Sequence, residues 1–221
     1  MNDPQEARTR LAAHVENDSP FALELLACMH QQGQMGFAKD HREAARLFRR
    51  AAKLGKPRAN VRLGLLKLEG AKGVRQDPDG ALAAFLSAAR GGDVYGQYLA
   101  GRVLLDDEAD AEGSTRQAIV LWEAAAEQGL GAAAAALGTI YDRGEGVPRN
   151  LAHAAIWYAK ASELGDDVAT ERLEELRVET AHIFRGMKFV WLIVLCIPAT
   201  SSLRGPAKPV FPCRVYVLAL A

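Results

Sequence analysis

The sequence predicts an all-α fold, a right-handed α/α solenoid of about four antiparallel helix-pair repeats, and two spacings carry that prediction. A glycine expected just after the second helix of each pair recurs at steps of 37, 37 and 36 residues, at Gly55, Gly92, Gly129 and Gly165. The polar residue expected to begin each second helix recurs at steps of 37, 37, 37 and 36, at Asp3, Asp40, Asp77, Ser114 and Asn150. Such a period is typical of stacked helix pairs, which bury their apolar faces against neighbouring copies.

The clearest copy of the repeat occupies residues 133–169. Its pattern predicts two short helices joined by a turn that contains glycine. A small residue at Gly138 allows the two helix backbones to approach closely, and large side chains fill the remaining space. By their register, Trp122, Trp157 and Tyr158 are therefore predicted to be core aromatic residues.

The chain begins with a half-repeat. Asp3, Pro4 and Glu6 supply an N-cap, a proline at the first helical position and a glutamate that can close a capping box. We therefore expect a helix over residues 3–16, in the register of a second helix. Much of its outer side is charged, which suits the polar end that an array of repeats needs.

Four complete helix pairs follow. First helices are predicted to start near Pro20, Pro57, Asp93 and Leu130, and second helices near His41, Pro78, Thr115 and Leu151. Before each second helix stands a side-chain oxygen that can accept a bond from a free backbone N–H, typically worth about 1 kcal/mol; these residues are Asp40, Asp77, Ser114 and Asn150. Three first helices can end in the left-handed conformation that glycine tolerates, at Gly33, Gly70 and Gly144.

One more helix, in the position of a first helix, is expected over residues 167–179. It is the last helix of a repeat domain that covers residues 1–179. This helix carries Glu174 where every complete copy has glycine or alanine. Because a neighbouring helix cannot pack closely over a buried charge without a large cost, we expect the stacking to end there.

Residues 180–221 form a tail that differs in composition from the repeats. It contains nine consecutive apolar residues, Phe189–Ile197, and no acidic residue follows Glu179. A membrane-spanning helix needs about 20 largely apolar residues, and no run in the tail is that long. We expect a poorly ordered extension, with docking on the last repeat and a peripheral membrane anchor as the alternatives.

The residues of the clearest copy resemble the Sel-one-like repeat family. The pattern is carried, in order, by Ala133, Leu137, Gly138, Tyr141, Gly144, Gly146, Val147, Asn150, Trp157, Tyr158 and Gly165. Copies are expected at about residues 22–58, 59–95, 96–132 and 133–168, the third being the weakest. The resemblance implies an α-solenoid that binds proteins, often as an adaptor. Some members carry a cysteine pair in every repeat and are linked to β-lactam binding, and this chain lacks those cysteines.

Composition narrows the class of partner. Lysine plus arginine equals aspartate plus glutamate at 27 each, so there is no overall positive field to attract nucleic acid. Three cysteines form no C-x-x-C motif and are expected to be reduced, and the polar segment that follows Met1 has no apolar stretch of a signal peptide. These features favour a cytoplasmic location.

No sequence motif indicates a catalytic, metal-binding or cofactor-binding site, so we expect no catalytic residue, no metal site and no cofactor. The G-x-G-x-x-A pattern at Gly129 lacks the preceding strand that a nucleotide-binding turn needs. The acidic run from Asp106 to Glu112 lacks the glycine and the final glutamate of a calcium loop, and a solvated loop is expected. The histidines show no zinc spacing, and Cys28 is expected to be unreactive.

The sequence therefore predicts a protein-interaction scaffold, not an enzyme, that binds a peptide or a partner protein on its concave face. First helices usually line that face in such stacks. Some positions on the first helices are not required for packing between helices. These positions give the candidate partner-binding residues Tyr98, Arg102, Leu65, Thr139, Asp142 and Gln31. Two alternatives remain open: a hydrolase acting on cell-wall or β-lactam material, and an adaptor tethered to a membrane by its tail.

Overall fold

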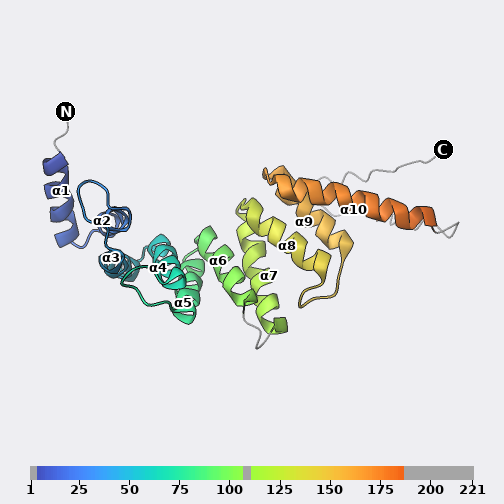
Figure 1. Ribbon diagram of the computed structural model, residues 1–221, viewed down its shortest axis with the longest axis horizontal. Coiled ribbons are helices and arrows are strands. Elements are labelled where there is room, and N and C mark those ends of the chain that lie inside the picture. The colour runs from blue at the N-terminus through green and yellow to red at the C-terminus, as the bar shows by residue number, and fades with distance from the viewer. Residues whose placement is uncertain (1–3, 107–110, 187–221) are drawn as a thin grey trace, which may run out of the picture.

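The structure, a computed structural model, describes residues 4–106 and 111–186. Within those residues it contains ten helices and no strand. The helices are α1 (Pro4–Glu16), α2 (Pro20–Gln32), α3 (His41–Lys53), α4 (Pro57–Glu69), α5 (Pro78–Arg90), α6 (Val94–Leu105), α7 (Ala111–Glu127), α8 (Gly131–Arg143), α9 (Leu151–Glu163) and α10 (Asp167–Gly186). They follow one another along an elongated stack, with α1 and α10 at opposite ends (Figure 1). The predicted all-helical solenoid is confirmed.

The helices pack as four pairs. Each first helix, α2, α4, α6 or α8, packs most extensively on the second helix that follows it, and each second helix also packs on the next first helix. In addition, α4 contacts α6 directly. The buried side chains form three apolar clusters along the stack, so the core is distributed over the repeats and not confined to one centre.

Glycine sets the distance between the two helices of three pairs. A Cβ atom added to Gly64 would lie 2.5 Å from the ring of Phe85, and one added to Gly138 would lie 2.6 Å from the ring of Tyr158. Gly101 faces the ring of Trp122 in the same way. Both predicted core aromatics of these contacts, Trp122 and Tyr158, are buried. Trp157 is only half-buried.

The predicted helix ends are mostly confirmed. Asp40 accepts bonds from the backbone N–H groups of Arg42 and Glu43 at 2.9 and 3.0 Å. Asp77 and Asn150 cap α5 and α9 through the N–H groups of Gly80 and His153, at 2.9 and 3.1 Å. Gly33, Gly70 and Gly144 end three first helices with φ of 69°, 64° and 73°.

The third pair differs from the prediction. Helix α7 begins at Ala111 and not near Thr115, so Ser114 lies inside the helix, 6% exposed, and the expectation that it caps a helix is wrong. Glu112 in the first turn accounts for the earlier start, because a negative side chain is favourable at a helix N-terminus and its carboxylate pairs with Arg116 at 2.9 Å. The predicted loop is correspondingly shorter, and residues 107–110 lie outside the described residues.

The two end helices differ in length. Helix α1 is close to its predicted bounds, whereas α10 continues to Gly186, past the predicted end at residue 179. The expected start of the tail, residues 180–186, is therefore helical, and the expectations for residues 187–221 fall outside the described residues. Glu174 is exposed and pairs with Arg177, as a charge at the end of an array should be.

Candidate functional site

The first helices carry one stripe of side chains that differ at every repeat. The position near the middle of each first helix, at steps of 37 residues, is occupied by Cys28, Leu65, Arg102 and Thr139. The fold therefore repeats its backbone along this stripe but not its chemistry. Three of the predicted partner-binding residues, Leu65, Arg102 and Thr139, lie in it.

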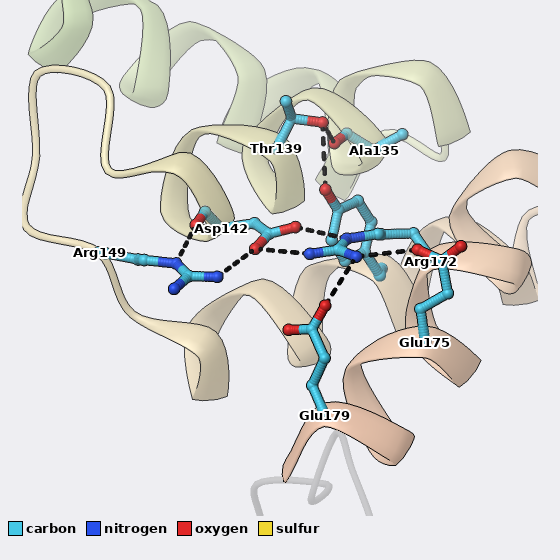
Figure 2. Close-up of polar contacts among 8 residues, drawn as sticks. Ala135, Thr139, Asp142, Arg149, Arg172, Glu175 and Glu179 are labelled. Atoms are coloured by element: carbon cyan, nitrogen blue, oxygen red, sulfur yellow. Dashed lines mark hydrogen bonds and ion pairs between the residues drawn. The ribbon is translucent and has the colours of Figure 1, made fainter. Parts of the chain in front are cut away.

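Thr139 and Asp142 line a groove at the end of the stack. Figure 2 shows this groove between α8 and α10, with α9 behind it and the loop that precedes α9 beside it. Its volume is about 840 Å³. It is the place where the sequence-predicted residues come closest to forming a site.

Asp142 is the centre of an ion-pair network in this groove. Its carboxylate accepts two bonds from the Arg172 guanidinium, from Nε at 2.6 Å and from Nη2 at 3.1 Å. Arg149 approaches the same carboxylate at 3.4 Å and donates from Nε to the backbone oxygen of Asp142 at 2.6 Å. Only 8% of the Asp142 side chain is exposed. A carboxylate this buried needs such charged partners, because an unpaired buried charge is costly.

The network stabilises the ionised forms of Asp142 and Arg172. The Arg172 guanidinium keeps the pKa of Asp142 below its usual range, against the opposing effect of burial and with a further contribution from Arg149. The contacts with Asp142 and Glu175 raise the pKa of Arg172. Glu175 and Glu179 pair with Arg172 at 2.8 and 3.2 Å. Asp142 therefore stays ionised at neutral pH.

The expectation that packing leaves Asp142 free is wrong, because its carboxylate is already bound by two arginines of its own chain. Sequence reasoning missed Arg149 and Arg172. Arg172 lies 30 residues beyond Asp142, and no local pattern shows that α10 brings it back to the end of α8. A role of Asp142 in binding a partner stays a prediction.

Thr139 is also engaged within the chain. Its hydroxyl donates to the backbone oxygen of Ala135 at 3.0 Å, and it accepts a bond from the Tyr158 hydroxyl at 3.3 Å. The bond from Tyr158 joins α9 to α8 beside the Asp142 network (Figure 2). The groove is therefore lined by polar groups that already have partners.

Tyr98 and Arg102 lie together on α6. The guanidinium carbon of Arg102 is 5.9 Å from the centroid of the Tyr98 ring, a cation–π arrangement. Tyr98 is half-buried, its ring centroid is 6.2 Å from that of Trp122, and its backbone oxygen accepts a bond from Trp122 Nε1 at 2.9 Å. Tyr98 thus contributes to the packing of the third pair, whereas Arg102 is exposed.

Leu65 lines a second groove, between α4 and α6. Its volume is about 160 Å³, and its lining consists of Arg58, Val61, Arg62, Leu65, Asp93, Tyr95 and Leu99. Sequence reasoning found Leu65 but missed the two arginines and Tyr95. The signal was present, because Phe21, Arg58 and Tyr95 recur at 37-residue steps in the first turn of successive first helices.

Gln31, the last predicted binding residue, lies near the end of α2 and lines neither groove. Its amide oxygen is buried without a hydrogen-bond partner among the described residues, as are the Nδ1 atoms of His30 and His41. Cys28, also on α2, carries a half-buried thiol, and burial raises its pKa. That shift favours the protonated thiol, which is the less reactive form.

Within residues 4–106 and 111–186, no group of three or more histidine, cysteine, aspartate or glutamate side chains could hold a metal ion. In the same residues no helix is both long enough and apolar enough to cross a bilayer.

Comparison with protein families gives a match over most of the chain. The model of the Sel1 repeat matches residues 20–56, 57–93, 94–130 and 131–166. These segments begin about two residues before the copies expected from the sequence, because they start with the first helix itself.

Individual proteins resemble the chain over about four-fifths of its length. A chitin synthase regulator of Malassezia restricta is 31% identical over 180 residues, which are 78% of this chain but only 12% of the regulator. A Sel1 repeat protein from Oxalobacter formigenes has a TM-score of 0.66 at 28% identity, over 79% of this chain and 70% of that one. A protective antigen of uropathogenic Escherichia coli strains, described as displaying an SLR fold, has a TM-score of 0.70 at 27% identity, over 80% of this chain and 37% of that one.

Proposed function

The chain belongs to the Sel1 repeat family, and from that premise we propose that it is a protein-interaction scaffold whose first helices bind a peptide or a partner protein. Sel1 repeats generally mediate contacts between proteins. The finer statement, that this chain binds through the face formed by α2, α4, α6 and α8, is our proposal. We propose no catalytic role.

One observation carries the proposal: the interior of the stack repeats, whereas the stripe along its first helices, half-buried at Cys28, Leu65 and Thr139 and exposed at Arg102, does not. Gly64, Gly101 and Gly138 make the same contact with an aromatic ring in three pairs. The stripe position one residue after each of them is Leu65, Arg102 or Thr139. Side chains that the repeat does not dictate are the ones available to give an array of uniform backbone its specificity.

The comparisons support a regulatory or adaptor role without naming a partner. One relative is named as a regulator of chitin synthase. This chain spans about an eighth of that protein (12%), so its activity and partners cannot be carried over whole. What the likeness supports is the class of function, a protein that acts by binding another.

The test is site-specific photo-crosslinking in the native cell. A photoreactive amino acid would be placed in the full chain at Leu65 or Arg102 on the first helices, and at Arg46 or Ala83 on the exposed side of the second helices. We expect discrete crosslinked products from the first-helix positions only. Crosslinks that form equally from all four positions, or only from α3 and α5, would refute the proposed binding face.

Arg102 also allows a direct measurement of binding affinity once a partner has been identified. We expect Arg102→Ala to weaken binding by about 1–2 kcal/mol, as is common for an exposed arginine at an interface. Tyr98 is a poorer probe, because its truncation would also remove packing against Trp122. Arg49→Ala on α3 is the matched control, and an equal loss in both variants would place the contact elsewhere.

A further inference from the structure

The groove between α4 and α6 combines an apolar pocket with two arginines. Val61, Leu65 and Leu99 supply the apolar part of its lining. Arg58 and Arg62 are four residues apart on α4, and residues at this spacing lie one above the other on one helix face. The guanidinium groups therefore stand beside the apolar pocket, on the same side.

Neither arginine has an anionic partner in the parts of the chain that the structure describes, since no ion pair there includes Arg58 or Arg62. Two acidic residues are near. Asp93 is engaged as the cap of α6, accepting a bond from the Gly96 N–H at 2.9 Å, and Glu24 lines the adjoining hollow, which also contains Arg58. The arginines are thus available for a carboxylate from outside the chain.

Exposed aromatic residues flank the arginines. Phe21 on α2 is 71% exposed and Tyr95 on α6 is 56% exposed, and they occupy the positions equivalent to Arg58 in the neighbouring pairs. Lys56 lies over the Phe21 ring. Aromatic residues and arginine are the types that dominate the energetics of protein interfaces.

The size of the groove indicates what it can hold. Its volume of about 160 Å³ lies below the range of roughly 300–1,000 Å³ typical of sites for whole small molecules. It is suited to one apolar side chain. A longer ligand would then extend along the first helices, where the arginines and the aromatic rings are.

We propose that this groove binds a peptide segment of a partner protein that inserts one apolar side chain between α4 and α6 and presents carboxylates to Arg58 and Arg62. The inference rests on the proposed scaffold function and names the class of its partner. Each guanidinium offers a planar fork to a carboxylate. The chain's own segment beyond Glu179 is a poor occupant, because it contains Arg185, Lys188, Arg204, Lys208 and Arg214 and no acidic residue.

The test uses synthetic peptides and the full chain. The probe is a short fluorescein-labelled peptide with one leucine between glutamates in a serine and glycine background. Two control peptides replace the leucine by serine or the glutamates by glutamine. Fluorescence anisotropy should show binding of the probe that is at least about tenfold tighter than that of either control peptide.

Matched variants locate the site. Arg58→Ala with Arg62→Ala should weaken binding of the probe by about tenfold or more. Arg49→Ala with Arg75→Ala removes the same charge from grooves on another part of the surface and should change binding by less than about threefold. Arg58→Lys with Arg62→Lys keeps the charge, loses the fork, and should give an intermediate loss. Circular dichroism of each variant establishes that it is folded.

Four outcomes would overturn the proposal. Equal losses of affinity in the two double-alanine variants would indicate a general attraction of the acidic peptide to positive charge. Equal binding of the leucine and serine peptides would show that no apolar side chain enters the pocket. Dimerisation that disappears with Arg58→Ala and Arg62→Ala would make a second copy the occupant. First-helix crosslinks in cells without binding of any acidic peptide would leave the scaffold function in place and refute only this groove's assignment.

Discussion

The grooves between α4 and α6 and between α8 and α10 are built from equivalent positions of the repeat, yet their charges are arranged differently. Arg62 on α4 and Leu99 on α6 line the first groove, and their equivalents in the repeat are Ala136 on α8 and Arg172 on α10, of which Arg172 lines the second groove. The position of Asp142 at the end of α8 corresponds to Leu68 at the end of α4. Arg172 therefore pairs with a carboxylate of its own chain, whereas Arg62 forms no ion pair within the described residues.

This difference shows how a solenoid of nearly constant backbone can arrange charged side chains differently in its repeats. Where Asp142 and Arg172 meet, the charges are neutralised internally and help to hold the last helix on the stack. Where Leu68 replaces the aspartate, the arginines stay available to a ligand. The exchange of a few side chains decides between the two, because the glycine–aromatic contact that sets the distance between paired helices is the same in both repeats.

The largest effect should come from the glycine–aromatic contact that the α4–α5 and α8–α9 pairs share. Gly64→Leu and Gly138→Leu should each destabilise the chain by about 3 kcal/mol, because a side chain there collides with the ring of Phe85 or Tyr158. Urea unfolding followed by circular dichroism measures this. Ala83→Leu on the exposed side of α5 is the control and should stay within about 0.5 kcal/mol. A large loss in only one of the two glycine variants would mean that the α4–α5 and α8–α9 pairs do not pack in the same way.

The next effect separates the two grooves. Arg172→Ala should cost about 2 kcal/mol of unfolding free energy, because it leaves the buried Asp142 carboxylate with Arg149 alone. Arg62→Ala should cost less than about 0.5 kcal/mol, since Arg62 has no ion pair to lose in the described chain. Equal costs in the same urea experiment would contradict the contrast drawn between the grooves.

The pH dependence of stability should reveal the Asp142 charge. Its pKa is lowered in the folded state, chiefly by Arg172, so its contribution is fully present above the unfolded value of about 3.9 and is lost as the pH falls through the folded pKa. We expect Asp142→Asn to be less stable than the natural chain by about 1 kcal/mol between pH 5 and 8. Below about pH 4 the difference should shrink. A difference that stays constant down to pH 2 would indicate that the carboxylate is not stabilised by its charge.

The smallest effect tests whether one groove can be converted into the other. Leu68→Asp and Leu99→Arg together place an aspartate and an arginine at the positions of Asp142 and Arg172. A double-mutant cycle on unfolding free energy should give a favourable coupling of about 0.5–1 kcal/mol. The double variant should also bind the acidic peptide more weakly than Leu99→Arg alone, because the new carboxylate competes for the arginines. Zero coupling would show that the backbones of the two grooves differ, although the two grooves use equivalent positions of the repeat.

Much of the fold could be predicted because its signals are local. The caps at Asp40, Asp77 and Asn150 each act on a backbone N–H two or three residues away, and the turn glycines adopt their conformation without help from distant residues. The error at Ser114 has the same origin. Ser114 fits both the period and a local cap pattern with Gln117, but the acidic first turn of α7 favours an earlier start of the helix.

The sequence by itself determined the period, the helix pairs, the family and the stripe of first-helix positions that contains Leu65, Arg102 and Thr139. Only the tertiary structure decided which of those positions are free. Asp142 and Arg172 are 30 residues apart, and Arg58 is brought beside Tyr95 by the packing of α4 on α6. The reason is physical: caps and turns depend on neighbours along the chain, whereas the partner of a charged side chain depends on how the repeats stack in space.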